Sequence, residues 1–475
     1  MSLYLSVDFY KHAAQTHPDG TGKRVLEVTD ALNQLGRKLD AVRFTDEAFA
    51  QEQVTQLSQP QQPGKTLPLK AVPLAHKELY GRTFKDGSGW PYEGGSKTYE
   101  GQTASRTATV IDKLDSAGAI DCGRLVSVEY ALGVTGHNAY AGTPKNPWNP
   151  AYICGGSSSG SGAVVAAGIV PAALGSDTGG SIRLPAAACG LVGVKPTQGL
   201  VSRTGVFALS NALDTVGPLS RSVRDSAQCL SVLAGYDAQD NQSINTEQPD
   251  YLNGLEDGLE GIRIGLAERY FLTGSTAEVA DPVASCFERC AKLGAICHDL
   301  VIEGIEATNP LNVLLIATEA AHVHKKTILD RPELLNDQTL MRVLTGIFTS
   351  DGNYRRLQAC RADFIARTLP DLFDKVDLFM APVWPFALPT IKDSDVGANP
   401  EAAPLMQRIG HNTRPVNFLG LPAICLPIGF DANGLPLSVQ LVGKPFSEAI
   451  LLRVARAIER EYDFWSHRPD LSVFG

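Results

Sequence analysis

A lysine and two segments rich in glycine and serine are the residues of this chain best suited to nucleophilic chemistry. Lys77 follows the apolar run AVPLA at 71–75, and the two segments are GGSSSGSG at 155–162 and GSDTGGS at 175–181. A serine hydroxyl becomes a nucleophile only when a base accepts its proton. A lysine can be that base when it is neutral, and burial lowers the pKa of a lysine by up to about 3 to 5 units. Lys77 in apolar surroundings is therefore a candidate activator of one of these serines.

The same segments allow two other interpretations. Glycine-rich loops bind phosphates, but the chain contains neither Gly-x-x-x-x-Gly-Lys-Ser/Thr nor Gly-x-Gly-x-x-Gly after a strand. Gly156, Ser158 and Gly160 fit the Gly-x-Ser-x-Gly motif of a hydrolase elbow, with His411 or His467 as a later base. That motif is weak in a stretch so rich in glycine and serine, and it leaves the second segment unexplained.

Long stretches of the chain resemble the amidase signature family. The resemblance is dense from about 66 to 225, where it includes PLKAVPLAHKEL, the whole tract between the two segments, and NALDTVGPLSRSVRD. It returns at DLFMAPVWP and at NTRPVNFLGLPAICLPIGF. By position, the resemblance assigns the catalytic lysine to Lys77, a middle serine that follows a cis peptide bond to Ser157, and the nucleophile to Ser181. It implies that neutral Lys77 draws a proton through Ser157 from Ser181, which forms an acyl-enzyme that water then hydrolyses.

Residues around the nucleophile are expected to support this reaction. Gly179 and Gly180 free the backbone so that neighbouring amides can converge on the oxyanion that develops in the transition state. We expect Asp177 and Arg183 to hold the loop and Ser158 to reinforce the proton relay by hydrogen bonding. The predicted oxyanion hole consists of the backbone N–H groups of Thr178, Gly179, Gly180 and Ser181.

Other polar residues are predicted to have structural roles. The resemblance requires no histidine, so His76 and His137 are expected to pack in the core. Cys286 and Cys290 are four residues apart in a helical pattern close to Cys297 and His298, which fits small buried side chains better than a zinc site. Because the relay that the resemblance implies supplies both base and acid, we expect no metal and no organic cofactor.

Two departures from the family pattern concern residues beside the relay. The family usually has aspartate after the lysine, where this chain has Glu78, and commonly Gly-Gly where Ser159 and Gly160 stand. Neither position supplies one of the three reacting side chains. Both could change the packing that shifts the pKa of Lys77.

The elements that must position these residues are predicted to form an α/β fold. Strand and helix patterns alternate, which is typical of a sheet covered by helices. Residues 24–57 and 124–131 have helical periodicity, 58–65 reads as a loop, and 67–76 reads as a strand ending at Lys77. The resemblance implies one large domain at 1–475 with a central twisted mixed sheet and helices on both faces. Within it we expect a helical N-terminal layer at 1–65, the signature core at 66–225, a variable helical substrate-pocket region at 226–375, and a C-terminal sheet and helix at 376–475.

Composition excludes several classes of protein. The chain has 475 residues, with 42 Lys and Arg against 51 Asp and Glu, for a formal net charge of −9. No overall positive field attracts nucleic acid or an anionic membrane, and no signal peptide or membrane span is apparent. Nine cysteines at scattered spacings fit reduced thiols in the cytoplasm. We expect a small-molecule amide or carbamate and water as partners, no nucleic acid and no membrane; whether the chain forms a homodimer is open.

The predicted function is hydrolysis of carbon–nitrogen bonds other than peptide bonds, by a stand-alone amidase. Within the resemblance, the alternative is the glutamine-hydrolysing A subunit of a tRNA-dependent amidotransferase. That subfamily has an aspartate three residues before the threonine of Thr-x-x-x-Asn, to hold the amino group of glutamine, whereas Thr413 is preceded there by Gly410. A catalytically silent scaffold is a second alternative, although Lys77, Ser157 and Ser181 are all present.

The identity of the amide, carbamate or ureide stays open. Trp384 and Phe386 suggest an apolar or aromatic substrate pocket, or else they pack the core.

Overall fold

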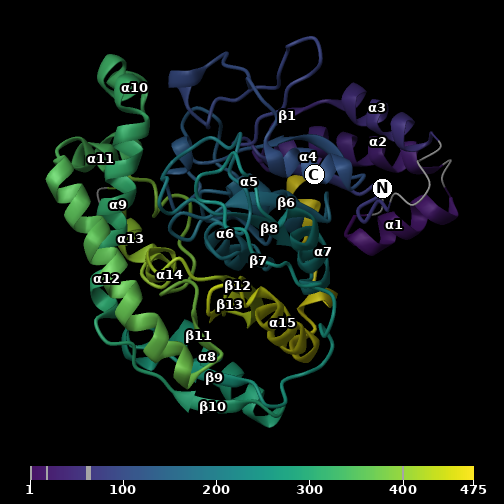
Figure 1. The fold of residues 1–475 in the computed structure, drawn as a ribbon. Coiled ribbons are helices and arrows are strands. Elements are labelled where there is room, and N and C mark those ends of the chain that lie inside the picture. The colour runs from purple at the N-terminus through teal and green to yellow at the C-terminus, as the bar shows by residue number, and fades with distance from the viewer. Residues whose placement is uncertain (1–2, 18–19, 60–65, 398, 400) are drawn as a thin grey trace.

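An eight-stranded mixed sheet forms the centre of the computed structural model, which describes residues 3–17, 20–59, 66–397, 399 and 401–475 (Figure 1). The two pairings made by Arg263–Leu266 are parallel, and the remaining pairings are antiparallel. In order across the sheet the strands are β10 (Ile296–Asp299), β9 (Arg263–Leu266), β11 (Leu378–Pro382), β13 (Pro436–Gly443), β12 (Ala423–Phe430), β7 (Val192–Lys195), β8 (Val216–Ser220) and β6 (Ala172–Ser176).

A smaller sheet brings Lys77 to the edge of the large one. Its order is β1 (Val42–Thr45), β3 (Ile120–Leu125) and β2 (Pro73–Lys77). β2 packs beside β6, and the backbone N–H of Leu174 on β6 donates to Nδ1 of His76 on β2 at 3.2 Å. Because Lys77 and Ser176 are the last residues of these two strands, their side chains meet at the strand ends. A two-stranded ribbon of β4 (Lys145–Asn146) and β5 (Asn149–Ile153) lies apart from both sheets in the pairing order.

Helices surround the central sheet (Figure 1). The buried apolar core at the sheet draws on residues from Val7 to Phe474, so both ends of the chain contribute to it. The helices are α1 (Val7–Thr16), α2 (Thr21–Ala31), α3 (Glu47–Leu57), α4 (Thr109–Ser116), α5 (Ser159–Ala166), α6 (Arg183–Ala188), α7 (Val223–Leu233), α8 (Ala277–Lys292), α9 (Thr308–Val323), α10 (Lys325–Asp330), α11 (Asp337–Ile347), α12 (Asp351–Lys375), α13 (Ala402–Ile409), α14 (Arg414–Phe418) and α15 (Glu448–Tyr462).

The helices α9 to α12 form a layer at one side of the molecule, drawn in green at the left of Figure 1. α11 and α9 approach so closely that a Cβ on Gly346 would lie 1.9 Å from the carbonyl oxygen of Ala317. α14 packs against α9 from the sheet side. Side chains from α9 to α12 therefore lie opposite the loops at the centre of the molecule.

The predicted α/β fold with a mixed sheet is confirmed, but two local predictions are wrong. The helical pattern at 24–57 is interrupted by β1, which pairs with β3, for example Val42 with Leu125. The helix expected at 124–131 is absent, because β3 continues to Leu125 and only a short 3-10 turn follows at 129–131. In both places pairing between distant residues overrides the local pattern. Most of the loop predicted at 58–65 lies outside the described residues.

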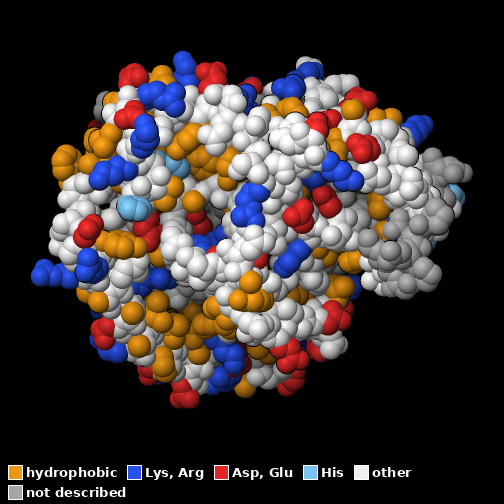
Figure 2. Space-filling model, turned by 45° about the horizontal axis from the view of Figure 1, so that its top comes forward, with side chains coloured by type: hydrophobic (Ala, Val, Ile, Leu, Met, Phe, Trp, Pro, Cys, Tyr) orange, Lys and Arg blue, Asp and Glu red, His pale blue; other side chains and the backbone are white. Residues whose placement is uncertain are grey.

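The exterior shows no large area of one charge in the view of Figure 2, where acidic and basic side chains are interspersed. Within the described part of the chain, no helix combines the length and the apolar character needed to cross a membrane.

Candidate active site

Lys77 is fully buried and lies against two serine hydroxyls. Its Nζ donates to Oγ of Ser157 at 2.7 Å and to Oγ of Ser176 at 2.9 Å. Burial lowers the pKa of Lys77 from 10.5 to about 7, although the carboxylates of Asp214, Asp177 and Glu78 act in the opposite direction. A substantial fraction of this amine is therefore neutral near pH 7, which is the form that can accept a proton.

Ser157 sits at the turn that leads into α5. The Gly156–Ser157 peptide bond is cis, in agreement with what the resemblance implied. The carbonyl of Ser157 accepts from the backbone N–H of Val128 at 3.1 Å. The neighbouring Ser158 accepts at Oγ from the backbone N–H of Ser176 at 3.2 Å, so it fixes the end of β6 beside Lys77.

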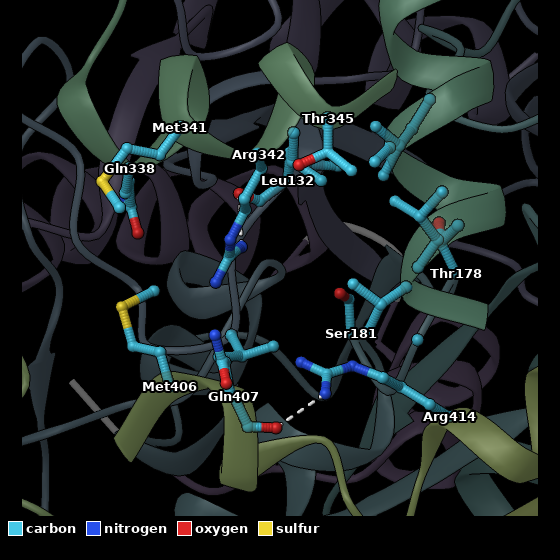
Figure 3. A pocket seen from close by; sticks show the side chains of 18 of the residues that line it. Leu132, Thr178, Ser181, Gln338, Met341, Arg342, Thr345, Met406, Gln407 and Arg414 are labelled. Atoms are coloured by element: carbon cyan, nitrogen blue, oxygen red, sulfur yellow. Dashed lines mark hydrogen bonds between the residues drawn. The ribbon is translucent and has the colours of Figure 1, made fainter. Parts of the chain in front are cut away.

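Ser181 lies in the wall of a cavity of about 500 Å³, with its hydroxyl directed into the space (Figure 3). Its carbonyl accepts from the backbone N–H of Ser158 at 3.3 Å, which joins the two serine segments. Thr178 and Gly179 line the same cavity. Among the described residues, the backbone amides of Thr178, Gly179 and Ser181 have no protein acceptor, so they are available to an oxyanion.

The Gly180 amide differs from the prediction. It donates to Oδ1 of Asp177 at 2.8 Å and is therefore already engaged within the protein. Gly180 has a φ of +128°, a conformation that side chains disfavour, and this turns the loop back toward Asp177. The predicted oxyanion hole is accordingly reduced to three free amides, at Thr178, Gly179 and Ser181.

Asp177 and Arg183 hold the loop from within. Nε of Arg183 donates to Oδ2 of Asp177 at 3.0 Å, and both side chains are fully buried. Burial alone would raise the pKa of Asp177, but the adjacent Arg183 guanidinium outweighs it and leaves that pKa well below its usual range. Nδ2 of Asn417 also donates to Oδ1 of Asp177, at 2.8 Å. The carboxylate thus ties the nucleophile loop to α6 and α14.

Two loops and four helices enclose most of the cavity beside Ser181. The loop at 131–134 and the loop at 178–181 form one side, and α9, α11, α13 and α14, together with Leu209 and Val396, contribute the remainder. Figure 3 shows Arg342 and Arg414 extending into the space from different helices. The apolar part of the wall includes Leu132, Val313, Ile316, Met341 and Met406.

Trp384 and Phe386 do not line this cavity, so the suggestion that they form the substrate pocket is not supported by their position. The indole N–H of Trp384 donates to the carbonyl of Leu184 at 3.1 Å, and its ring packs 3.1 Å from the position that a Cβ on Gly155 would take. Both residues border a separate, much smaller cavity of about 20 Å³. Trp384 therefore packs behind the first serine segment.

The two histidines occupy structural positions. His76 is buried and accepts from β6 as described above, and burial lowers its pKa to about 3. The Nε2 atom of His137 lies 3.1 Å from Oγ of Ser394. Within the described ranges, no group of three or more His, Cys, Asp or Glu side chains is arranged to hold a metal ion.

The departures from the family pattern pack in the core. Glu78 is buried and accepts from the backbone N–H and Oγ of Ser127 at 2.9 and 3.2 Å, and burial raises its pKa to about 7. Gly160 has no room for a side chain, because a Cβ there would lie 2.5 Å from the carbonyl oxygen of Ala41.

Four residues of the site are not among those predicted from the sequence: Ser176, Asn417, Arg342 and Arg414. Ser176 is part of the second serine segment, two residues after Leu174. It lies next to Lys77 only because β2 packs beside β6. Asn417 lies in the Thr-x-x-x-Asn motif, which was considered only for a substrate contact. Arg414 lies in the same motif, directly after Thr413, but the motif alone does not mark it as a cavity residue, and Arg342 belongs to no motif that the residues alone reveal.

Comparisons with known proteins identify the family to which the chain belongs. The model of the family described as Amidase matches residues 24–452. The chain is 34% identical over 461 residues to the A subunit of the glutamyl-tRNA(Gln) amidotransferase of Neisseria meningitidis, covering 91% of this chain and 90% of that protein. It is 36% identical over 437 residues to the corresponding A subunit of Chloroflexus aurantiacus, covering 87% of each. A solved structure of a vestigial protein complex that bears on the origins of an s-triazine catabolic enzyme has a TM-score of 0.87 at 26% identity, covering 98% of this chain and 100% of that one.

Proposed function

The chain belongs to the amidase family, whose members hydrolyse carbon–nitrogen bonds, and on that premise we propose that it cleaves a small carboxamide through an acyl-enzyme on Ser181. The observation that carries the proposal is the contact of a buried lysine, whose pKa burial lowers to about 7, with the hydroxyl of Ser157 at 2.7 Å, next to the segment that holds Ser181.

In the proposed reaction, Lys77 accepts a proton from Ser157, which accepts one from Ser181. The Oγ atom of Ser181 then bonds to the substrate carbonyl carbon, and the carbonyl electron pair moves onto the oxygen. The amides of Thr178, Gly179 and Ser181 stabilise this oxyanion, each being worth on the order of 3 kcal/mol. The carbon–nitrogen bond breaks as the stored proton returns to the leaving nitrogen, so an amine or ammonia departs. Water repeats the attack on the ester and releases the acid.

The comparisons favour the alternative that sequence analysis placed second. The residues before Thr413 favour a stand-alone hydrolase, but the relatives at 34% and 36% identity are A subunits of glutamyl-tRNA(Gln) amidotransferases. We therefore place a glutamine-hydrolysing, ammonia-releasing A subunit first, which would work with partner subunits. The stand-alone amidase remains a second candidate, because Gly410 provides no carboxylate where that subfamily holds the amino group of glutamine.

Labelling with a fluorophosphonate probe tests the nucleophile. We expect the wild-type protein to be labelled and Ser181→Ala to lose both labelling and amide hydrolysis, by at least about 10³-fold in kcat. Ser159→Ala is the matched control, because Ser159 is a buried serine of the first segment whose Oγ has no hydrogen-bond partner among the described residues. It should be labelled as wild type. Absence of labelling in fresh wild-type protein would favour the silent scaffold.

Release of ammonia from L-glutamine separates the two candidates. The chain is assayed alone and after coexpression with the partner subunits of a bacterial tRNA-dependent amidotransferase. An A subunit is expected to bind those partners and to release ammonia from L-glutamine faster in the complex. A stand-alone amidase is expected to hydrolyse other amides equally well without them.

A further inference from the structure

A second hydroxyl group besides that of Ser157 contacts the Lys77 amine. The Nζ atom lies 2.9 Å from Oγ of Ser176, the last residue of β6, and 2.7 Å from Oγ of Ser157. Ser176 does not line the cavity beside Ser181. It is therefore placed to act on the reaction through Lys77 rather than through contact with the substrate.

The proposed reaction needs one particular orientation of the amine nitrogen. A protonated lysine is a donor only. The neutral amine has two N–H bonds and one lone pair, and it accepts a proton from Ser157 only when the lone pair faces that hydroxyl. If an N–H bond faces Ser157 instead, the serine oxygen accepts a hydrogen bond and no proton is transferred. An oxygen that accepts one N–H on the other side of the amine favours the productive orientation.

The two hydroxyl groups lie on different sides of the lysine. The first serine segment, which carries Ser157, is hydrogen-bonded to Ser181. Ser176 instead borders a second cavity, of about 450 Å³. Exposed residues line this cavity too, so it reaches the surface: Asn211, Gln239 and Asn241. The Ser176 hydroxyl can donate its hydrogen to solvent on this side, which leaves its oxygen free to accept from Nζ.

The sheet holds Ser176 beside the lysine. Its backbone N–H donates to Oγ of Ser158 at 3.2 Å, and that Oγ donates to the Ser176 carbonyl at 3.4 Å. Ser176 also pairs with Val216 of β8. The position of the Ser176 oxygen is therefore set by the fold and does not depend on a bound substrate.

The charged groups around Lys77 do not provide this orientation. The carboxylates of Asp214, Asp177 and Glu78 favour the protonated lysine by their charge, against the effect of burial on its pKa. In the described part of the chain, however, the hydrogen-bond acceptors of Nζ are the two serines. Asp214 accepts from Oγ1 of Thr178 at 2.6 Å, and the other two carboxylates are held by the partners given above. Only a serine oxygen therefore fixes the direction of an N–H bond.

From this geometry we infer that Ser176 is a positioning residue for the base: its oxygen accepts one N–H of Lys77 and so turns the lone pair of the amine toward Ser157. The inference rests on the proposed reaction at Ser181 and adds the group that orients its base. The same contact favours the protonated lysine, because a hydrogen bond from a charged donor is stronger than one from a neutral donor. Loss of the oxygen should therefore lower both the reactivity of Ser181 and the pKa of Lys77.

Ser176→Thr and Ser176→Val test the inference, because threonine and valine have nearly the same shape and differ in the hydroxyl group. The measurement is the rate at which a fluorophosphonate probe labels Ser181 between pH 5.5 and 9, which does not depend on the identity of the amide. We expect Ser176→Thr to be labelled at close to the wild-type rate. In Ser176→Val, the rate at the plateau should fall by about 10- to 100-fold. The midpoint of its rise with pH should move down by about 1 pH unit.

Ser161→Ala is the matched control. Ser161 is a buried serine of α5 that also contacts β6, but its Oγ donates to the backbone carbonyl of Leu174 at 3.0 Å. This variant should keep the wild-type labelling rate and midpoint. Far-UV circular dichroism shows whether each variant is folded. If Ser176→Val is not folded, Ser176→Ala takes its place in the comparison with Ser176→Thr.

Two kinds of result would overturn the inference. One is an unchanged rate or an unchanged midpoint in the variant without the hydroxyl. The other is a loss of labelling as large in Ser176→Thr as in Ser176→Val, because the shape of the side chain rather than its oxygen would then be decisive. Both leave the proposed hydrolysis standing, since Ser181 of the wild type is still labelled. If Ser181 of the wild type were not labelled at all, the proposed function would fail as well.

Discussion

At the scale of single residues, the reaction proposed for this protein depends on how burial acts on Lys77. A protonated lysine cannot accept a proton, and the exposed side chain is almost entirely protonated at pH 7. Burial lowers the pKa of Lys77 to about 7. Since the shift is downward, the native state disfavours the protonated form, and stability should rise with pH between about 7 and the pKa of the unfolded chain. Burial of Lys77 thus lowers the stability at neutral pH, and it supplies the neutral amine that the proposed reaction needs.

The activity should follow the same titration. We expect kcat/KM of the wild type to rise as the pH passes through about 7 and to level off above it, because only neutral Lys77 activates the serines. Lys77→Met should lower kcat by about 10²- to 10⁴-fold and abolish this rise. The measurement is a pH profile between pH 5.5 and 9 with fixed ionic strength.

Lys195 provides a matched control for that experiment. It is also a buried lysine whose pKa burial lowers to about 7, but its Nζ donates to the carbonyl of Pro196 at 2.9 Å rather than to a serine. Lys195→Met should retain the rise near pH 7. If the two variants had the same flat profile, the titration could not be assigned to the Lys77 amine.

At the scale of elements, the loop between β6 and α6 holds Ser181, the proposed nucleophile, through contacts on both sides of the loop. Asp177 holds the loop on the side of α6, and Thr413 holds Gly179 from the side of α14. A Cβ on Gly180 would lie 2.4 Å from Oγ1 of Thr413. A side chain at this position would therefore push the loop away from α14 and displace the oxyanion amides.

Gly180→Ala is expected to lower kcat by about 10²- to 10³-fold, the range for the loss of one oxyanion donor. Gly87→Ala is its control, because Gly87 also has a positive φ, of +84°, but a Cβ there has no atom within 4 Å. Both substitutions place alanine in an unfavourable backbone conformation, at a cost of about 1 to 2 kcal/mol. Normal activity in Gly180→Ala, measured as acylation and turnover, would show that the loop tolerates the displacement.

The proton relay and the loop that carries Ser181 can be predicted from the sequence. The two serine segments are local patterns, and the family resemblance assigns a role to each of them. It does not indicate Ser176 as a partner of Lys77, since that contact arises only where β2 meets β6. The helical pattern at 24–57 likewise failed to predict β1, whose partner β3 lies far along the chain. Arg342 and Arg414 come from separate helices, and only the fold brings them together in one cavity. Contacts between distant segments account for what the local patterns missed.

At the scale of the whole molecule, the reaction site depends on segments from across the chain. The central sheet joins residues from Ala172 to Gly443, and the strand that carries Lys77 reaches the loop that carries Ser181 because β2 of the smaller sheet packs beside β6. The layer α9 to α12 is tied to this core by a buried charged group. Oε2 of Glu319 on α9 accepts from the backbone N–H of Ala212 at 2.9 Å, and Oε1 accepts from the hydroxyl of Tyr354 on α12 at 2.6 Å.

We expect this arrangement to unfold as one cooperative unit, as predicted for a single domain. Separating α9 to α12 from the rest would expose Leu315 and Phe418, which are both fully buried where the layer meets α14, and would leave Glu319 without its partners. Urea unfolding followed by tryptophan fluorescence, which includes Trp90 and Trp384, and by far-UV circular dichroism, dominated by the helices, should give coincident transitions. Ser181→Ala should unfold at nearly the same midpoint, because its effect is on chemistry. If the circular dichroism signal fell in an earlier step while both buried tryptophans stayed native, the helical layer would be a separate unit, and the cavity that holds Arg342 would open before the core unfolds.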